Sequence, residues 1–481
     1  MKPLYQCIFA MVALILISLP VHSANLSNPQ QVKDCNFSKS ANWWQQGYDS
    51  LPNNIANNPV TGDPEFCEFY QFAEDWFLYL ISPQSAKTSQ ANWENTSRFP
   101  LLELSGTNSC DKDAPAHSFN LRMIKSADDS SPFQMPERID QAGADAIYDQ
   151  QGNVVFYEIR FSRNLCDVKA IQSQANFPGK TLELKMAWRI MTADDDPQQY
   201  YQTTAIINDQ PQQLGLVGWH IVITADNHPE MVWVTVDHSN NAVVCDQIGA
   251  QQSAYDFTSQ ACAKNIKDCN NLNQSLKSTS ISLPSDVQPN DICQVFPFGT
   301  QASTDTSSRD WLNIALIEKL NDSLQNQLLA SANLPTSMKV WKNYQVTGAL
   351  WISDINKSSS DTSNQRGSLK LANTVMETTF QGDPHTGEGT LNCFVCHNYN
   401  APDSGKSNTA YGANLSHIFD DVIDGQCQDF QAKSVINSQS QAEAACPQVC
   451  NAQSLTWHGQ WTNQDAKTGA QLPMTVCGCC P

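Results

Sequence analysis

The sequence predicts an α+β protein: a large, mainly antiparallel β-rich domain with helices, followed by a small α+β module stapled by disulfides. Three observations predict this class. Short runs rich in Val, Ile, Tyr and Trp are separated by Gly, Asn and Asp turns, as in antiparallel sheets. Two other segments carry apolar residues at helical spacing. Finally, six cysteines crowd into residues 427–480.

The large domain is predicted to contain two helices and at least four strands. Residues 67–81 are aromatic-rich with helical spacing and should pack into a core, and residues 310–334 form a second amphipathic helix. A Ser-, Thr-, Asn- and Pro-rich connection covers residues 271–290. The predicted strands are Val154–Arg160, Leu182–Trp188, Leu214–Thr224 and Met231–Asp237.

The final module is predicted to contain one short helix and a pair of strands. Residues 437–445 have a polar helix start. The helix is expected to end at Cys446, because Pro447 disfavours helix in the residue before it. Trp457–Trp461 and Met474–Cys477 are predicted to pair as strands of a small sheet.

The first 24 residues predict export. Lys2 gives a short basic start, residues 8–19 are almost wholly apolar, and Val21–Ala24 offers small residues for cleavage. The apolar run is shorter than the roughly 20 residues that a membrane-spanning helix needs, and no later stretch is predicted to span a membrane. The mature chain is therefore expected to be soluble and either periplasmic or secreted.

Cysteine usage agrees with an oxidising compartment. Of 17 cysteines, Cys7 lies in the signal peptide and 16 remain. If two of these hold a haem, 14 are left, an even number suited to disulfides. Because the small module can bury little apolar surface, four cysteines are expected to staple it in one of three connectivities. They are Cys446, Cys450, Cys477 and Cys479.

Charge excludes some classes of partner. The 481-residue chain has a net charge of −20, with only 16% charged residues. Nucleic acid and anionic membranes are poor partners for such a surface, because phosphate binding needs clustered Lys and Arg. A neutral ligand fits better, and glycans are neutral.

Cys393-Phe-Val-Cys396-His397 has the spacing of a covalent c-type haem site. Attachment needs two thiols that add across the haem vinyl groups and a histidine that reaches the iron. Cys393 and Cys396 are therefore the predicted anchors of one haem c, and His397 is the predicted proximal ligand. Two alternatives stay open: a structural disulfide, or a thioredoxin-like redox pair, although no βαβ pattern surrounds the motif.

Met376 is the candidate for the second axial ligand of the iron. Methionine often partners histidine in electron-transfer haems. The alternative is a core residue, which is the more common role of a methionine at helical spacing. His385 and His417 are near in the sequence and equally open as candidates.

Trp457-His-Gly-Gln-Trp461 has chemistry that suits sugars. A pyranose offers an apolar C–H face to an aromatic ring, and hydroxyls to amide and backbone groups. Trp457 and Trp461 supply the first kind of contact, and Gln460 and the backbone at Gly459 supply the second. The alternative is a stapled mini-domain whose tryptophans form its core.

Three segments of the module, Cys446–Cys450, Trp457–Trp461 and Met474–Cys479, together resemble the mannan-binding lectin (MVL) family. The resemblance implies specificity for mannose-rich glycans, bound around the tryptophan segment and the helix start near Asn437. His458 stands where that family usually has Asn or Thr. Those lectins carry the module in tandem, whereas this chain has one copy, so its affinity is expected to be weaker.

Residues 66–400 resemble a family of exported bacterial proteins described as cytochrome c-like, which end in one Cys-x-x-Cys-His. The resemblance implies a haem-bearing domain and no particular reaction. The implied boundaries are 1–24 for the signal peptide, 25–415 for the cytochrome c-like domain and 424–481 for the lectin-like module. The matching segments are Gln141–Gly143, Asp149–Arg160, Lys185–Ile190, Gly215–Val222, Trp233–Asp237 and Leu371–Thr378.

The favoured interpretation is an exported protein that recognises mannose-rich glycans and carries a haem c on its large domain. One alternative is a haem-dependent oxidoreductase or electron carrier that the lectin delivers to polysaccharide surfaces; another is a haem-free structural adhesin. The sequence identifies no redox partner. His220, Asp237 and His238 are candidate metal ligands for which a structural role is favoured.

Overall fold

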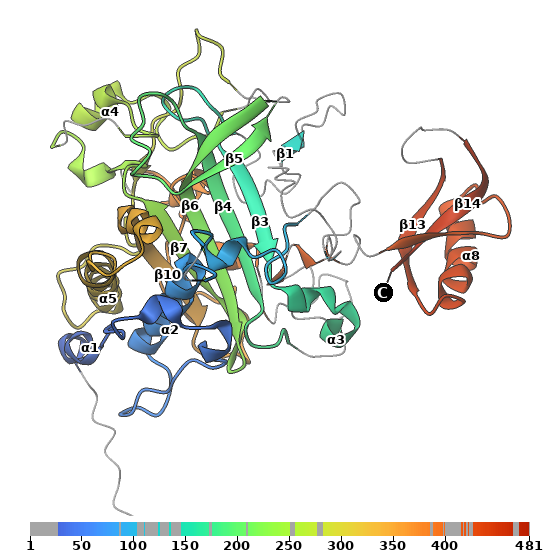
Figure 1. The fold of residues 1–481 in the computed structure, drawn as a ribbon, viewed down its shortest axis with the longest axis horizontal. Helices are drawn as coiled ribbons and strands as arrows, with labels where there is room; N and C mark the ends of the chain where they lie inside the picture. Colours follow the sequence, from blue (N-terminus) through green and yellow to red (C-terminus); the bar gives the residue numbers. More distant parts are fainter. Residues whose placement is uncertain are drawn as a thin grey trace, which may run out of the picture.

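The computed structural model describes most of the chain after residue 26 (Figure 1). The predicted signal peptide lies outside the described residues. No helix in the described part is both long and apolar enough to cross a membrane. The described residues are 27–85, 88–102, 110, 124–125, 134–135, 146–172, 176–207, 210–250, 255–276, 282–384, 388–397, 399, 415–416, 418–419, 422, 427–464 and 471–480.

A seven-stranded antiparallel sheet forms the centre of the large domain, as far as the structure describes it. The order is β11–β10–β7–β6–β4–β3, and β5 also pairs with β6. The four predicted strands are confirmed as β3, β4, β6 and β7. The strands are β3 (Phe156–Phe161), β4 (Leu182–Ile190), β5 (Gln202–Ile207), β6 (Gln210–Ala225), β7 (His228–His238), β10 (Tyr344–Ile352) and β11 (Gln365–Gly367).

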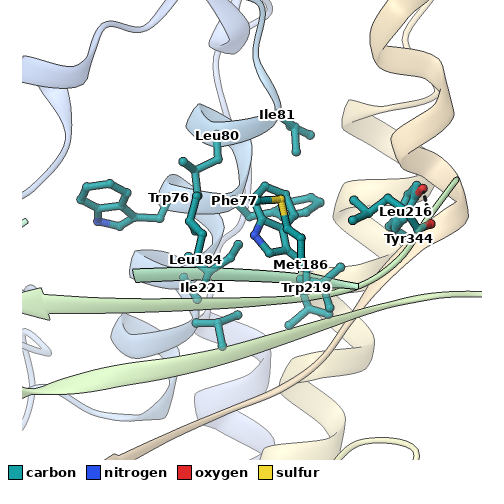
Figure 2. Close-up of a cluster of buried hydrophobic side chains, with 14 of the residues drawn as sticks. Trp76, Phe77, Leu80, Ile81, Leu184, Met186, Leu216, Trp219, Ile221 and Tyr344 are labelled. Atoms are coloured by element: carbon teal, nitrogen blue, oxygen red, sulfur yellow. Dashed lines mark hydrogen bonds between the residues drawn. The ribbon is translucent and has the colours of Figure 1, made fainter. Parts of the chain in front are cut away.

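Helices α2 (Phe66–Ile81) and α5 (Arg309–Asp322) pack against one face of this sheet. Figure 2 shows part of this core, where Phe77 of α2 lies beside Met186 and Trp219 of the sheet, and the ring centroids of Phe77 and Trp219 are 6.2 Å apart. Side chains two residues apart on a strand share a face, so alternate residues of each strand enter this core. Burial of each Phe or Leu there contributes about 1.5–3 kcal/mol.

The opposite face of the sheet carries a second, smaller hydrophobic cluster. Val222, Trp233 and Leu350 lie on one row across β6, β7 and β10, because Trp233 is in register with both neighbours. The segment that contains the Cys-x-x-Cys-His motif covers this row. It contributes Phe394, Tyr399, Leu415, Ile418, Phe419 and Val422 to the cluster.

The two predicted helices have different outcomes. The helix at residues 67–81 is confirmed as α2. The helix predicted over residues 310–334 is too long: α5 ends at Asp322, and a π-helical turn, Ser323–Leu328, follows. The Asn321 amide bonds both backbone groups of Val346 at 2.8 and 2.9 Å, which ties the helix end to β10. The wider turn still buries Leu324 and Leu328.

Smaller elements and four disulfides complete the large domain around its central sheet. The elements are α1 (Asn28–Asp34), α3 (Val168–Gln172), α4 (Gln260–Lys264), β1 (Ile124–Lys125), β2 (Gln134–Met135), β8 (Val243–Val244) and β9 (Cys293–Gln294). The disulfides are Cys35–Cys67, Cys110–Cys166, Cys245–Cys293 and Cys262–Cys269.

Candidate functional site

The C-terminal module is a small sheet with one helix packed on it (Figure 1). Its strands follow the antiparallel order β12–β14–β13, so the predicted strand pair is confirmed as β13 and β14. The elements are β12 (Gln428–Gln431), α8 (Gln439–Asn451), β13 (Thr456–Gln464) and β14 (Gln471–Cys480).

Two disulfides join α8 to β14: Cys446–Cys477 and Cys450–Cys479. The helical cysteines lie four residues apart and therefore share one helix face, and the strand cysteines lie two apart and share one sheet face. The predicted staples are confirmed, in this one of the three connectivities. A third disulfide, Cys427–Cys480, links the start of β12 to the end of β14.

The prediction that the helix ends at Cys446 is wrong. Helix α8 continues through Pro447 to Asn451. A proline inside a helix removes a hydrogen bond and costs about 3 kcal/mol or more. Here disulfides hold the helix to the sheet on both sides of Pro447, and this attachment offsets the cost. The polar start is confirmed, because Ser438 Oγ accepts a hydrogen bond from Gln441 N at 3.3 Å.

Trp457 and Trp461 flank an irregular part of β13. Trp457 is in register with Cys479 and Trp461 with Cys477, so residues 458–460 stand opposite the single residue Gly478. Such a bulge takes residues out of the regular ladder. Both tryptophans are half-buried and pack against the disulfide core of the module. They therefore have a core role and also an exposed part; the side chains of His458, Gly459 and Gln460 lie outside the description.

Asn437 lies at the end of the module where the helix begins. It is exposed, and its backbone N donates to Gln441 Oε1 at 2.8 Å. The preceding residue, Ile436, accepts a hydrogen bond from Asn463 Nδ2 at 2.7 Å. Asn463 is two residues beyond Trp461, so the structure brings the helix start close to the tryptophan strand. The sequence analysis missed Asn463, since its partner is distant in sequence.

One comparison with known proteins matches this module. A family model described as MVL, mannan-binding protein, matches residues 439–479, which run from the first residue of α8 almost to the end of β14. The module is thus similar to mannan-binding proteins. The search of curated proteins returned no match, and neither did the search of solved structures.

The Cys-x-x-Cys-His motif forms a short helical turn, Cys393–Val395, on the second face of the large sheet. Asn392 holds its start: Oδ1 accepts from Phe394 N at 3.1 Å, and Nδ2 donates to Leu369 O at 2.8 Å. His397 N donates to Cys393 O at 2.9 Å. The turn brings both cysteines and His397 together, as the prediction requires.

Cys393 and Cys396 are thiols, and the other 14 described cysteines form seven disulfides. The predicted division of the cysteines is therefore observed. The structural disulfide considered for this pair is not formed. Burial raises the pKa of the Cys393 thiol well above its ordinary value, with Glu377 adding to the effect. A thioredoxin-like nucleophile needs the opposite shift.

His397 has the surroundings of a metal-ligating histidine. Its side chain is buried, and Nδ1 lies 2.9 Å from Leu415 O. Donation to that carbonyl places the proton on Nδ1 and the lone pair on Nε2, which is the usual tautomer of a ligating histidine. Two thiols and an imidazole in this state are the donor set that a c-type haem needs, so the residues present fit the group.

Met376 does not join this cluster. It is fully buried in the main core on the helix-covered side, whereas Phe394 of the motif belongs to the second cluster. The core interpretation of Met376 therefore fits the structure, and the prediction of an axial ligand gains no support. His385 and His417 lie outside the described residues.

The three candidate metal ligands on the sheet have protein partners instead. His220 Nε2 lies 2.8 Å from Glu377 Oε2, and Nδ1 lies 2.9 Å from Thr235 Oγ1. Burial opposes ionisation of Glu377, but His220 and Lys185 outweigh it and lower its pKa. Lys185 Nζ lies 3.5 Å from Glu377 Oε1. A structural role for His220 fits these contacts.

Asp237 and His238 also fit a structural role. Asp237 accepts a hydrogen bond from Thr374 Oγ1 at 2.7 Å, and burial raises its pKa to about 7. His238 Nε2 lies 3.0 Å from Gln199 O, and burial lowers its pKa to about 4. One other group in the described part, Cys262 with Cys269 and Asp291, has ligand spacing, but its two sulfurs form a disulfide.

Proposed function

We propose that this protein recognises mannose-rich glycans through its C-terminal module. The observation that carries the proposal is the match of a mannan-binding family model to residues 439–479. The module geometry supports it. Two half-buried tryptophans flank a bulged segment of β13, and the hydrogen bond from Asn463 to Ile436 ties the helix start to the same strand.

The proposed contacts follow from sugar chemistry. The exposed parts of Trp457 and Trp461 pack on apolar C–H faces, and the Gln460 amide with bulge backbone groups bonds the hydroxyls. Asn437 adds a polar contact at the helix start. A net charge of −20 does not repel a neutral glycan, so binding depends little on salt.

Titration of the full-length protein against mannan and oligomannose tests this function, with galactose polymers as controls. A single shallow site is expected to bind with a dissociation constant of order micromolar to millimolar. Gln460→Ala should weaken binding and leave the fold intact. Gln448→Ala, on the exposed surface of α8, is the matched control and should bind normally. Equal binding of mannose and galactose polymers by disulfide-bonded protein contradicts the proposal.

We also propose that the large domain carries one covalent haem c on Cys393 and Cys396, with His397 as proximal ligand. The supporting observation is that these two thiols stay outside seven disulfides, next to a histidine whose Nδ1 faces a carbonyl. A haem bound there supplies one-electron transfer, so the protein is an electron carrier or oxidoreductase that its lectin module delivers to polysaccharide.

Intact mass of protein from a host with cytochrome c maturation tests the haem. One haem should be added, and its colour should persist after acid–acetone extraction. Cys396→Ala should weaken attachment, and His397→Ala should alter the iron spectrum with less effect on attachment, because thiols and iron ligand have separate roles. A mass without haem supports the haem-free adhesin instead.

We propose that the protein works outside the cytoplasm. The signal-like first 24 residues and the seven disulfides support export, since disulfides persist in oxidising compartments. Fractionation of the native host should find the protein, cleaved near residue 24, in the periplasm or the medium. Uncleaved protein in the cytoplasm contradicts this.

A further inference from the structure

We propose that Trp233 is a positioning residue that orients the His397 imidazole for iron ligation. This inference rests on the proposed haem. Trp233 belongs to β7 and pairs with Val222 of β6 on one side and Leu350 of β10 on the other. All three side chains lie on the second face of the sheet. The indole is therefore held within a rigid sheet, far in the sequence from the motif it meets.

The indole contacts two residues of the motif. Its ring centroid lies 4.3 Å from that of His397, with 43° between the planes, and 6.2 Å from that of Phe394, at 77°. Trp233 is 7% exposed and His397 is 5% exposed, so the ring contact is shielded from water. Both motif residues therefore pack against this one indole.

Two restraints of different kinds act on the imidazole. The bond between Nδ1 and Leu415 O sets the rotation of the ring within its own plane. The indole face limits the tilt of that plane. A hydrogen bond alone leaves the tilt free, so the two restraints complement each other. A ligand ordered before iron binding loses less conformational freedom on binding, and the hydrogen-bonding partners that orient a metal ligand affect metal affinity by about 10–100-fold, which sets the scale for this ring contact.

Trp219 provides a matched control on the neighbouring strand. It is fully buried on β6, in register with Val236 of β7, but faces the main core on the other side of the sheet. A purely structural tryptophan at either position loses packing on substitution. Only Trp233 is expected to change the haem as well.

The test uses holoprotein with haem attached and compares Trp233→Phe, Trp233→Leu and Trp219→Phe. Nitric oxide bound to the ferrous haem weakens the bond to the proximal histidine, and electron paramagnetic resonance separates five- from six-coordinate nitrosyl haem. Trp233→Leu should raise the ratio of five- to six-coordinate haem about 10–100-fold over the parent. Trp233→Phe keeps a ring and should raise it less. Trp219→Phe should match the parent.

The outcomes separate this inference from the proposed haem. A parent protein without attached haem overturns both. Attached haem with the same coordination ratio in Trp233→Leu, Trp219→Phe and parent overturns the role of Trp233 alone. Circular dichroism of each variant checks the fold, and Trp233→Phe, which keeps most of the side-chain volume, still decides the question if Trp233→Leu does not fold. In that case, a ratio for Trp233→Phe equal to that of the parent overturns the role.

Discussion

The large domain and the C-terminal module differ in what fills their cores. In the large domain, aromatic and aliphatic side chains from α2, α5 and the sheet form the main cluster (Figure 2). In the module, four of the seven buried residues of the core cluster are half-cystines. Small domains bury a smaller fraction of their surface and so need covalent links. Apolar packing therefore stabilises the core of the long domain, and disulfides stabilise that of the short module.

The two regions also place their candidate sites differently. The haem motif lies on a rigid sheet face, where Trp233 and Leu415 hold His397. The candidate glycan site lies at a strand bulge, between two tryptophans that pack against the disulfide core. Loss of packing should therefore disturb the first site, and loss of disulfides should disturb the second. Four changes test this difference.

The largest expected effect, measured as structure and binding lost, comes from removing a module disulfide. Loss of a native disulfide from a small domain typically costs about 2–5 kcal/mol, which is most of what such a core supplies. The double variant Cys450→Ser/Cys479→Ser should lose the folded module and its mannan binding, while the large domain stays folded. Hydrogen exchange followed by mass spectrometry measures both regions in one sample.

The control for this prediction is Cys262→Ser/Cys269→Ser. That disulfide closes a loop with a sequence separation of only 7 and lies in the large domain. The loop-entropy account gives a short loop less stabilisation than a long one. Mannan binding should be normal in this variant. If the Cys450 variant binds mannan like the parent, the module does not depend on sulfur as argued.

Trp219→Ala should be the strongest single change in the large domain. Trp219 is fully buried, and its ring lies 5.7 Å from that of Trp341. Truncation of a buried tryptophan leaves a cavity and costs about 3–5 kcal/mol. Calorimetry should show the large-domain transition at a lower temperature, with mannan affinity unchanged. A parallel fall of both transitions would mean that the two regions unfold as one unit.

Local patterns predicted most of these elements, and long-range contacts explain what was missed. Alternating and apolar runs gave β3, β4, β6 and β7, and helical spacing gave α2. Strand β10 was not predicted, and its pairing with β7 joins segments that are far apart in the sequence. The end of α8 was predicted wrongly at Cys446, because local sequence rules do not include the disulfides that hold the helix on both sides of Pro447.

The same distinction between local sequence patterns and long-range contacts applies to the candidate sites. Cys393, Cys396 and His397 are neighbours in sequence, so their meeting was predictable. The contacts that hold them come from residues distant in sequence: Trp233 and Leu415. Likewise the tryptophan segment of the module was found from its composition, whereas Asn463 acts through a bond to Ile436 that no local pattern reveals.

Asp237 should make the stability of the large domain depend on pH. Burial raises its folded pKa to about 7, against about 3.9 in an unfolded chain. Between these values the folded state binds a proton that the unfolded state has lost, so the free energy of unfolding falls as pH rises from about 4 to 7. Asp237→Asn keeps an acceptor for Thr374 and should flatten this slope. His220 and Glu377 act on the same carboxyl.

Urea unfolding of parent and Asp237→Asn at several pH values, followed by large-domain tryptophan fluorescence, measures this difference. The difference in the free energy of unfolding between parent and Asp237→Asn should change between about pH 4 and 7 and stay constant above that range. Each unit of pKa shift corresponds to about 1.4 kcal/mol. Parallel curves across the range would contradict a buried, protonated Asp237. The module should respond equally in both proteins.

The smallest effect is expected from removing a capping serine at the start of one helix in each region. Ser438 begins α8 and accepts a hydrogen bond from Gln441 N at 3.3 Å; Ser308 begins α5 and accepts from Trp311 N at 3.1 Å. Replacing a capping serine by alanine typically costs about 1 kcal/mol. The free-energy cost of Ser438→Ala and Ser308→Ala should therefore be similar.

The two melting temperatures should nevertheless respond differently, because the entropy of unfolding scales with chain length. A loss of 1 kcal/mol lowers the melting temperature by about 4–8 °C in a domain of 60–100 residues, and by about 2–4 °C in one of 150–250 residues. Ser438→Ala should thus shift the module transition more than Ser308→Ala shifts that of the large domain. Scanning calorimetry of the full-length variants measures both shifts. Equal shifts in a single shared transition would show that the disulfide-rich module melts together with the packed domain.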